Sequence, residues 1–295
     1  MCFKKLEKMI MSDLKSCSNI LTEILQKFKS IFFLKYDFNI INKKFLKKID
    51  EVQFLKIKTD IFNDIKFFLI KPLFKLIKFL FRMILGQEMI TSLELTDKNK
   101  MKIIMCNLGH KIVFKMIPQI YEIMIMFINQ SKASQTSKLK SQMLSLTKYK
   151  FIESFDVDKE FSFNFNTPTT SSLTGKDLYL NAIENVNSIQ KRSTPLKKLD
   201  IISSIHQKIW GSILKSCESI DTKAFNELRV KLDADNLLSL YSYVIFNSKN
   251  HNLHTEIAFI EELLDEKVLN NYDNLYYFEM FKSALEYITN HISEN

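Results

Sequence analysis

The stretch that decides the fold runs from Asp233 to Ile288. It begins Asp233-Ala-Asp-Asn-Leu-Leu-Ser-Leu-Tyr-Ser-Tyr-Val-Ile-Phe and ends Tyr276-Tyr-Phe-Glu-Met-Phe-Lys-Ser-Ala-Leu-Glu-Tyr-Ile. Apolar residues recur there at spacings of three and four, which is typical of helices that pack one face on a core. The pattern predicts three short helices in a row. We expect Asp233 to cap the first helix, because its carboxylate can accept free backbone N–H groups.

The composition of the whole chain favours the same fold class. Its 295 residues include only four Gly and four Pro, too few for the many turns of a sheet-rich fold. We therefore predict an all-α protein, in which a helical bundle precedes a layered all-helical domain. The expected parts are a basic amphipathic helical region at 1–95, a helical bundle ending in a Ser/Thr-rich loop at 96–176, and the layered domain at 177–292. Pro118 is expected to start or kink a helix, and Pro195 is expected to start one.

The charge is distributed unevenly along the chain. The net charge is +9, but residues 1–150 carry 28 Lys and Arg against 12 Asp and Glu, and the rest carries 14 against 21. The two halves are therefore expected to meet different partners. An acidic half repels phosphates, so we do not expect a nucleic-acid partner. The basic half could face an anionic membrane surface or the acidic half itself.

Two polar or interrupted stretches need separate interpretation. Residues 67–85 are apolar but contain four cations at helical spacing, so a membrane span is not expected there. Either a bundle helix with a solvated lysine face or a basic helix on a membrane surface fits this pattern. Residues 131–142 are polar and predict a loop that runs into a helix near Met143. The N-terminus lacks the apolar core of a signal peptide.

Several chemistries are excluded by spacing. The four glycines are too far apart for a phosphate-binding loop, so the chain is not expected to be a GTPase or kinase itself. The four cysteines form no Cys-x-x-Cys, and no metal site is predicted. His251 and His254 lie near each other without a carboxylate or cysteine at ligand spacing, and we interpret them as surface histidines.

The order of the C-terminal motifs resembles the vacuolar protein sorting 9 domain, the core of exchange factors for early-endosomal Rab GTPases. The match covers about residues 177 to 290 and joins six pieces in register. They are Pro195-Leu-Lys-Lys-Leu199, Ala234-Asp-Asn-Leu-Leu-Ser-Leu-Tyr-Ser-Tyr-Val-Ile245, Asn252-Leu253, the aromatic-Ile pair Phe259-Ile260, Tyr276-Tyr-Phe278 and Ser283-Ala-Leu-Glu-Tyr-Ile288.

The resemblance implies roles for individual residues. Asp235 falls on the catalytic acid of the family, and Tyr276 on a tyrosine that hydrogen-bonds the GTPase switch region. Without the resemblance, Asp235 is an acid at a helix N-terminus and Tyr276 a core-edge tyrosine. Further GTPase-contact residues would be Leu238, Ser239, Tyr241, Ser242, Ile245, Tyr277, Glu279 and Ser283. The implied mechanism is electrostatic displacement of the nucleotide, with no cofactor and no covalent chemistry.

The sequence also departs from the family pattern. Asn236 replaces the second Asp, Ser239 a Pro and Glu279 a Thr. We therefore keep two functions open: an exchange factor for an early-endosomal Rab GTPase, or a non-catalytic helical adaptor that binds a Rab GTPase or a membrane surface. A purely structural bundle is a third possibility. The first implies a cytoplasmic protein peripherally associated with endosomal membranes.

Overall fold

The structure is a computed structural model, and it describes residues 22–23, 26–28, 30, 50–71, 75, 103, 105–112, 114, 118–145, 155–157, 179–216, 232–264, 269 and 275–290. These residues contain ten helical segments and no strand, which confirms the all-α prediction. The chain divides into two compact units. Unit 1 comprises 1–127 and 262–268, and unit 2 comprises 128–261 and 269–295. The predicted boundaries at 95/96 and 176/177 stay predictions.

Unit 1 contains α4 (Glu51–Asp64), the π-helix η1 (Ile65–Ile70) and the larger part of α7 (Pro118–Ser131). Asp50 caps α4, because its side chain accepts the Gln53 N–H at 2.8 Å. Inside the unit, the rings of Phe54 and Phe127 lie 5.5 Å apart. Pro118 begins α7, as its fixed φ predicts.

Only residues 67–71 and 75 of the apolar 67–85 stretch are described, and the remainder lies outside the described residues. Phe67, Lys71 and Lys75 are exposed. Both interpretations of this stretch therefore stay open. Within the part of the chain that the structure describes, no helix is long and apolar enough to cross a membrane.

Unit 2 contains the three helices predicted between Asp233 and Ile288. They are α14 (Ala234–Phe246), α15 (Leu253–Leu263) and α17 (Leu275–Asn290), and α15 runs two residues past the end of the unit at Glu261. Before them come α8 (Ala133–Ser145), α11 (Leu180–Ser188) with its 3-10 extension η4 (Ile189–Lys191), and α12 (Pro195–Ser216). Pro195 begins α12, as predicted.

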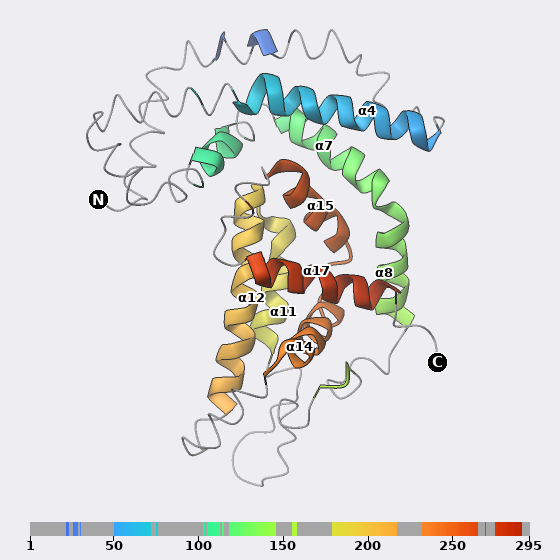
Figure 1. Cartoon of the computed structure of the whole chain (residues 1–295), viewed down its shortest axis with the longest axis vertical. Helices are drawn as coiled ribbons and strands as arrows, with labels where there is room; N and C mark the ends of the chain where they lie inside the picture. Colours follow the sequence, from blue (N-terminus) through green and yellow to red (C-terminus); the bar gives the residue numbers. More distant parts are fainter. Residues whose placement is uncertain are drawn as a thin grey trace, which may run out of the picture. The chain divides into compact units, whose positions relative to one another are not determined.

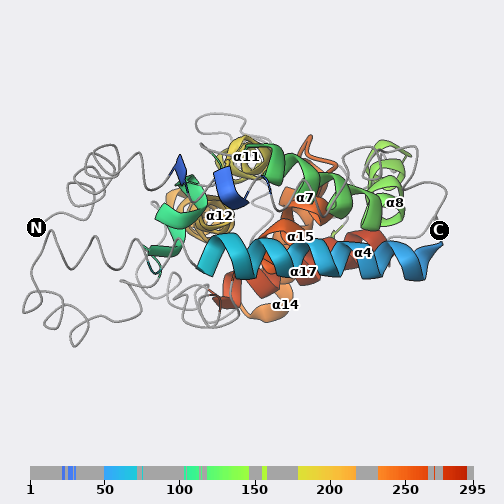
Figure 2. The same cartoon turned by 90° about the horizontal axis from the view of Figure 1, so that it is seen from above.

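The helices of unit 2 are arranged around α17. α11 lies alongside α12 in both views (Figures 1 and 2). α14 packs along α17, and α17 runs from α12 at its start to α8 at its end (Figure 1). Fully buried side chains from each of these elements form the core; they include Leu139, Val186, Ile205, Val244, Phe278 and Ile288.

The predicted loop at 131–142 is wrong, because α8 is helical from Ala133. Its polar composition hid a narrow apolar stripe. Leu139 and Met143, four residues apart, are both buried. The polar face is largely exposed, and Lys138 at its edge donates a hydrogen bond to Asn290 of α17 at 3.3 Å. Packing against α17 therefore stabilises a helix that propensity alone does not predict.

Candidate functional site

The start of α14 presents one carboxylate to solvent. Asp233 caps the helix: its Oδ1 accepts the Asn236 N–H at 2.9 Å and the Asn236 side-chain amide at 3.2 Å. Asp235 lies in the first turn and is exposed. No hydrogen bond or ion pair engages its carboxylate among the described residues. Because Asp233 satisfies the helix end, Asp235 is available for another role.

The contact residues predicted on α14 differ in burial. Leu238 and Ser239, one turn beyond Asp235, are half-buried. Tyr241, Ser242 and Ile245 are fully buried. The sequence alone left open which of these positions form the core. In this arrangement the last three do, while the first two border the exposed carboxylate.

The outer face of α17 carries the other predicted contact residues. Tyr276 is 56% exposed, and Glu279 and Ser283, at helical spacing from it, are exposed too. Tyr277 is half-buried. These positions form an exposed strip about two turns long, with Tyr276 at its start.

Glu279 belongs to an ion-pair network on the surface of α17. Lys282 contacts Glu279 at 3.5 Å and Glu261 of α15 at 2.7 Å. Partial burial lowers the pKa of Lys282, but the two carboxylates together raise it above its usual value. The lysine therefore stays charged at neutral pH and partly offsets the negative charge of Glu279.

One bound protein can cover the predicted contact residues of both α14 and α17. Burial mainly, and then Tyr277 and Tyr276, raise the pKa of Tyr241, and α14 packs along α17. Asp235 precedes Tyr241 by six residues, or about 9 Å along the helix axis. A typical interface of about 800 Å² per partner is roughly 30 Å across, so one protein surface can cover Asp235 and Tyr276 together.

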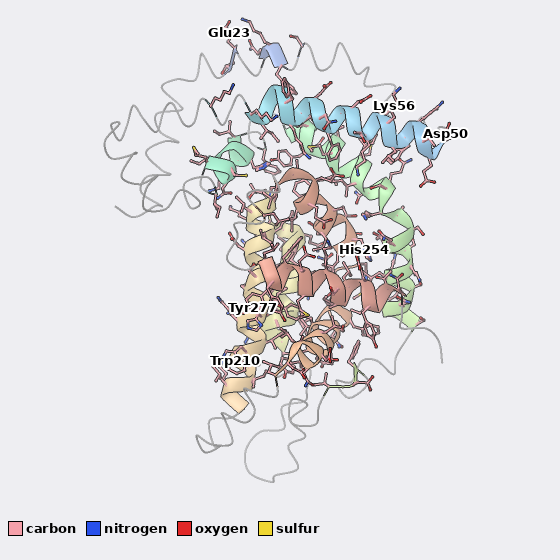
Figure 3. The ribbon with its side chains drawn as sticks, in the orientation of Figure 1. Glu23, Asp50, Lys56, Trp210, His254 and Tyr277 are labelled. Atoms are coloured by element: carbon pink, nitrogen blue, oxygen red, sulfur yellow. The ribbon has the colours of Figure 1, made fainter. Side chains whose placement is uncertain are left out.

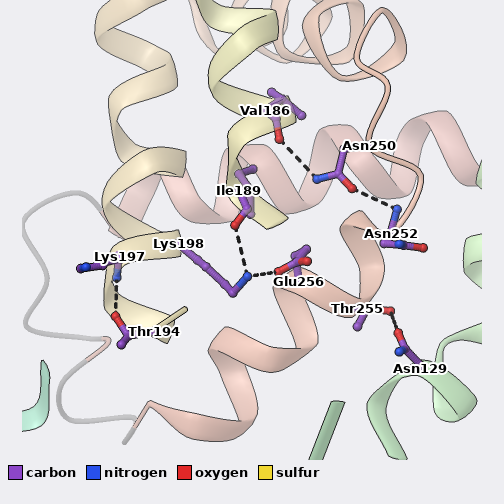
Figure 4. A network of polar contacts seen from close by, with 10 residues as sticks. All are labelled: Asn129, Val186, Ile189, Thr194, Lys197, Lys198, Asn250, Asn252, Thr255 and Glu256. Atoms are coloured by element: carbon purple, nitrogen blue, oxygen red, sulfur yellow. Dashed lines mark hydrogen bonds and ion pairs between the residues drawn. The ribbon is translucent and has the colours of Figure 1, made fainter. Parts of the chain in front are cut away.

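The buried ammonium group of Lys198 links α12 to η4 and to α15 (Figure 4). The Lys198 ammonium on α12 forms an ion pair with Glu256 of α15, donates to the Ile189 carbonyl at 3.1 Å, and lies 5.6 Å from the centre of the Phe259 ring. Lysine is rarely this buried unless it is paired. Sequence reasoning assigned no role to Lys198, although it is the Lys of the Pro-x-x-Lys-Leu motif.

The loop before α15 is fixed by an asparagine in the same network. Asn250 is buried, and its amide donates to the Val186 carbonyl of α11 at 3.3 Å while its side-chain oxygen accepts the Asn252 N–H at 3.2 Å. Thr255, near the start of α15, donates to Asn129 at 2.9 Å (Figure 4). A proline at position 250 has no side-chain donor or acceptor, so it could not make the two bonds of Asn250.

The interpretation of His254 as a surface histidine is wrong. It lies in the first turn of α15, is buried, and its Nε2 is 2.8 Å from the hydroxyl of Thr289. Burial, with a smaller contribution from Lys132, lowers its pKa to about 4. Because α15 starts at Leu253, His254 shares the inward face with Ala258, which the turn-like sequence did not indicate. His251, still in the turn, is half-buried.

No group of three or more His, Cys, Asp or Glu side chains that could hold a metal ion occurs among the described residues. Cys106 is buried. The predicted absence of a metal and of a cofactor stays a prediction.

Comparison with known proteins identifies the same region. The family model of the vacuolar sorting protein 9 (VPS9) domain matches residues 179–292. No curated protein and no solved structure matches the chain. The matched range begins at the residue before α11 and ends just beyond α17. It therefore contains Asp235, the exposed strip of α17 and the buried Lys198. The chain therefore carries a VPS9 domain, which spans residues 179–292.

Proposed function

We propose that this protein is a guanine-nucleotide exchange factor for an early-endosomal Rab GTPase. Its VPS9 domain implies the family of Rab exchange factors and suggests a Rab GTPase as partner. The observation that carries the proposal is the Asp235 carboxylate, which is exposed, without a partner among the described residues, and held on the first turn of a capped helix.

The proposed mechanism is electrostatic. A GTPase holds its nucleotide through Mg²⁺ and the phosphate-loop lysine. When the Asp235 carboxylate enters this site, it repels the β-phosphate, competes for the lysine and disfavours Mg²⁺. Binding of the exchange factor and binding of the nucleotide then weaken each other reciprocally, and GDP leaves. No bond is made or broken, so neither a cofactor nor a nucleophile is required.

The local structure supports this role for Asp235. A carboxylate that capped its own helix would lose a backbone hydrogen bond on moving into another protein. Here Asp233 makes that bond, and Asn236 donates its amide to the same carboxylate. Asp235 can therefore engage a GTPase while the helix start stays intact.

Tyr276 is the proposed second contact. Its exposed hydroxyl can donate to or accept from the switch region of the GTPase. Leu238, Ser239, Glu279 and Ser283 border it and Asp235 and are proposed as the surrounding contacts. Tyr241, Ser242 and Ile245 would act from the core by holding α14 in place. The proposed location is cytoplasmic, at the endosomal membrane, where such a GTPase works.

A non-catalytic adaptor that binds the GTPase without accelerating release is the second candidate. Glu279 favours it, because a carboxylate tied to Lys282 replaces the Thr of the family pattern on the expected contact surface. A desolvated charge at an interface is costly unless the partner supplies its opposite. Glu279 therefore restricts the partner to a GTPase with a cation at that place.

Release of a fluorescent GDP analogue from a panel of Rab GTPases separates the two functions. An exchange factor accelerates release from at least one member, whereas an adaptor binds without acceleration. Asp235→Ala should reduce the accelerated rate about a hundredfold, as loss of one preorganised charge does in other sites. Glu184→Gln removes an exposed carboxylate from α11 and serves as the matched control. Equal rates for Asp235→Ala and wild type would refute the site.

A further inference from the structure

The tyrosine pair of α17 is braced by a histidine of α12. The His206 and Tyr277 rings are stacked, with centroids 3.9 Å apart and planes inclined by 16°. Figure 3 shows the labelled Tyr277 against α12, on the same side of unit 2 as Trp210. Both rings are half-buried. The stack therefore joins the start of α17 to the middle of α12.

The stack depends on the histidine ring and not on its polar atoms. The His206 Nδ1 atom is buried and has no hydrogen-bond partner among the described residues. Burial lowers the pKa of His206, so the ring is neutral at neutral pH. Two neutral aromatic rings at this spacing attract each other by their faces.

Tyr241 of α14 is the buried neighbour of α17 on this side of the unit. Its side chain is fully buried, and its ring packs edge-on against that of Phe281, one turn beyond Tyr277, with centroids 6.3 Å apart. Tyr277 is thus held by α12 through its ring face, on a helix that α14 anchors one turn further along.

Tyr276 depends on Tyr277 for its own position. The Tyr276 ring is more than half exposed. Among the described residues, its ring contacts that of Tyr277 edge-on, with centroids 5.4 Å apart and planes inclined by 73°. An exposed tyrosine without such a neighbour samples several rotamers, and ordering it at an interface costs binding free energy.

We propose that His206 is a positioning residue for nucleotide exchange: by stacking on Tyr277 it orders Tyr276 for contact with the GTPase. This inference rests on the proposed function, since it assigns a supporting residue to the same site. His206 itself does not touch the GTPase. Its removal acts on the geometry of the tyrosine pair and leaves the Asp235 carboxylate in place.

Three variants of the 295-residue chain test the inference. His206→Leu keeps the bulk but removes the aromatic face, His206→Phe keeps the face but removes the nitrogens, and His251→Leu removes another half-buried histidine as a matched control. On a GTPase that the wild type activates, we expect kcat for GDP release to fall roughly tenfold in His206→Leu. His206→Phe should retain at least about half of the wild-type kcat, and His251→Leu should match wild type.

A second set of measurements separates positioning from folding. Thermal unfolding of each variant is followed by the fluorescence of Trp210, the single tryptophan. If both variants unfold at the same temperature, a difference in kcat between them cannot come from folding. We expect that difference: His206→Leu loses most of its kcat, and His206→Phe at most about half. Combining His206→Leu with Tyr277→Leu should cost no more than Tyr277→Leu alone, because both changes destroy one stack.

The possible failures are distinguishable. Wild-type kcat in His206→Leu, or equal losses in His206→Leu and His206→Phe, would overturn the role of the stack while the exchange activity stands. If the fold reductions in kcat of His206→Leu and Tyr277→Leu multiply in the double variant, the two rings act independently and the inference is wrong. If the wild type accelerates release from no Rab GTPase, the proposed function and this inference fall together.

Discussion

Replacing Lys198 by Met should destabilise unit 2 strongly. The side chains of Lys198 and Glu256 are only 7% and 13% exposed, so the change leaves a buried carboxylate without its counter-charge. Breaking a buried pair on one side costs about 3–5 kcal/mol. The Ile189 carbonyl also loses its donor. For a unit of this size, such a loss lowers the midpoint of thermal unfolding by roughly 6–20 °C.

The double variant Lys198→Met, Glu256→Leu should recover much of that loss. Two apolar side chains replace the ion pair, and neither charge then remains buried. Lys197→Met is the control, because it removes a half-buried lysine one position away without touching Glu256. It should change stability by less than about 0.5 kcal/mol.

Urea titration with Trp210 fluorescence measures these three variants and the single variant Glu256→Leu, because Trp210 lies on the same helix as Lys198. The reasoning is refuted if Lys198→Met costs less than about 1 kcal/mol. It is also refuted if the double variant loses the sum of the two single losses, since a coupled pair must be non-additive.

Three further predictions concern other parts of the chain. Because the pKa of His254 falls to about 4 on folding from a usual value of 6.5, its contribution to stability is complete above about pH 6.5 and is lost as pH falls toward 4; thermal unfolding at pH 7 and pH 5 should differ less in His254→Asn than in wild type. Asp233→Ala removes the cap of α14 and should cost about 1 kcal/mol of stability in urea titration. GDP release should also slow, because the turn that holds Asp235 frays; unchanged values in both assays would count against the cap. Leu139→Ala on α8 should cost about 2–5 kcal/mol in the same titration, because the side chain is fully buried; a loss below about 0.5 kcal/mol would mean that α8 does not support the core.

The helices that carry the VPS9 motifs were predictable from sequence because they bury wide apolar faces. In α14 and α17, apolar residues at spacings of three and four lie on the core, and local composition agrees with tertiary packing. Asp233 was predictable for the same reason, since capping is a local interaction between neighbours in sequence. The roles of Asp235 on α14 and Tyr276 on α17 came only from the family resemblance, and they stay predictions.

Features that depend on distant partners were not predictable. α8 buries only a narrow stripe, and the α17 surface that covers it comes about 130 residues later in the sequence. His254 looked like a turn residue because its partner, Thr289, lies 35 residues away. Lys198 resembled any surface lysine until α15 placed Glu256 beside it across 58 residues. A local pattern carries no signal for such pairs.

The central place of α17 has a consequence for biosynthesis. Translation delivers α8, α11, α12, α14 and α15 before α17, yet α17 packs against α8, α12 and α14. Until α17 has left the ribosome, the apolar faces that it covers on α8, α12 and α14 stay exposed, and the nascent chain offers a surface for chaperones or for aggregation. A chain that terminates before Leu275 should therefore be degraded rather than persist as a protein of reduced stability.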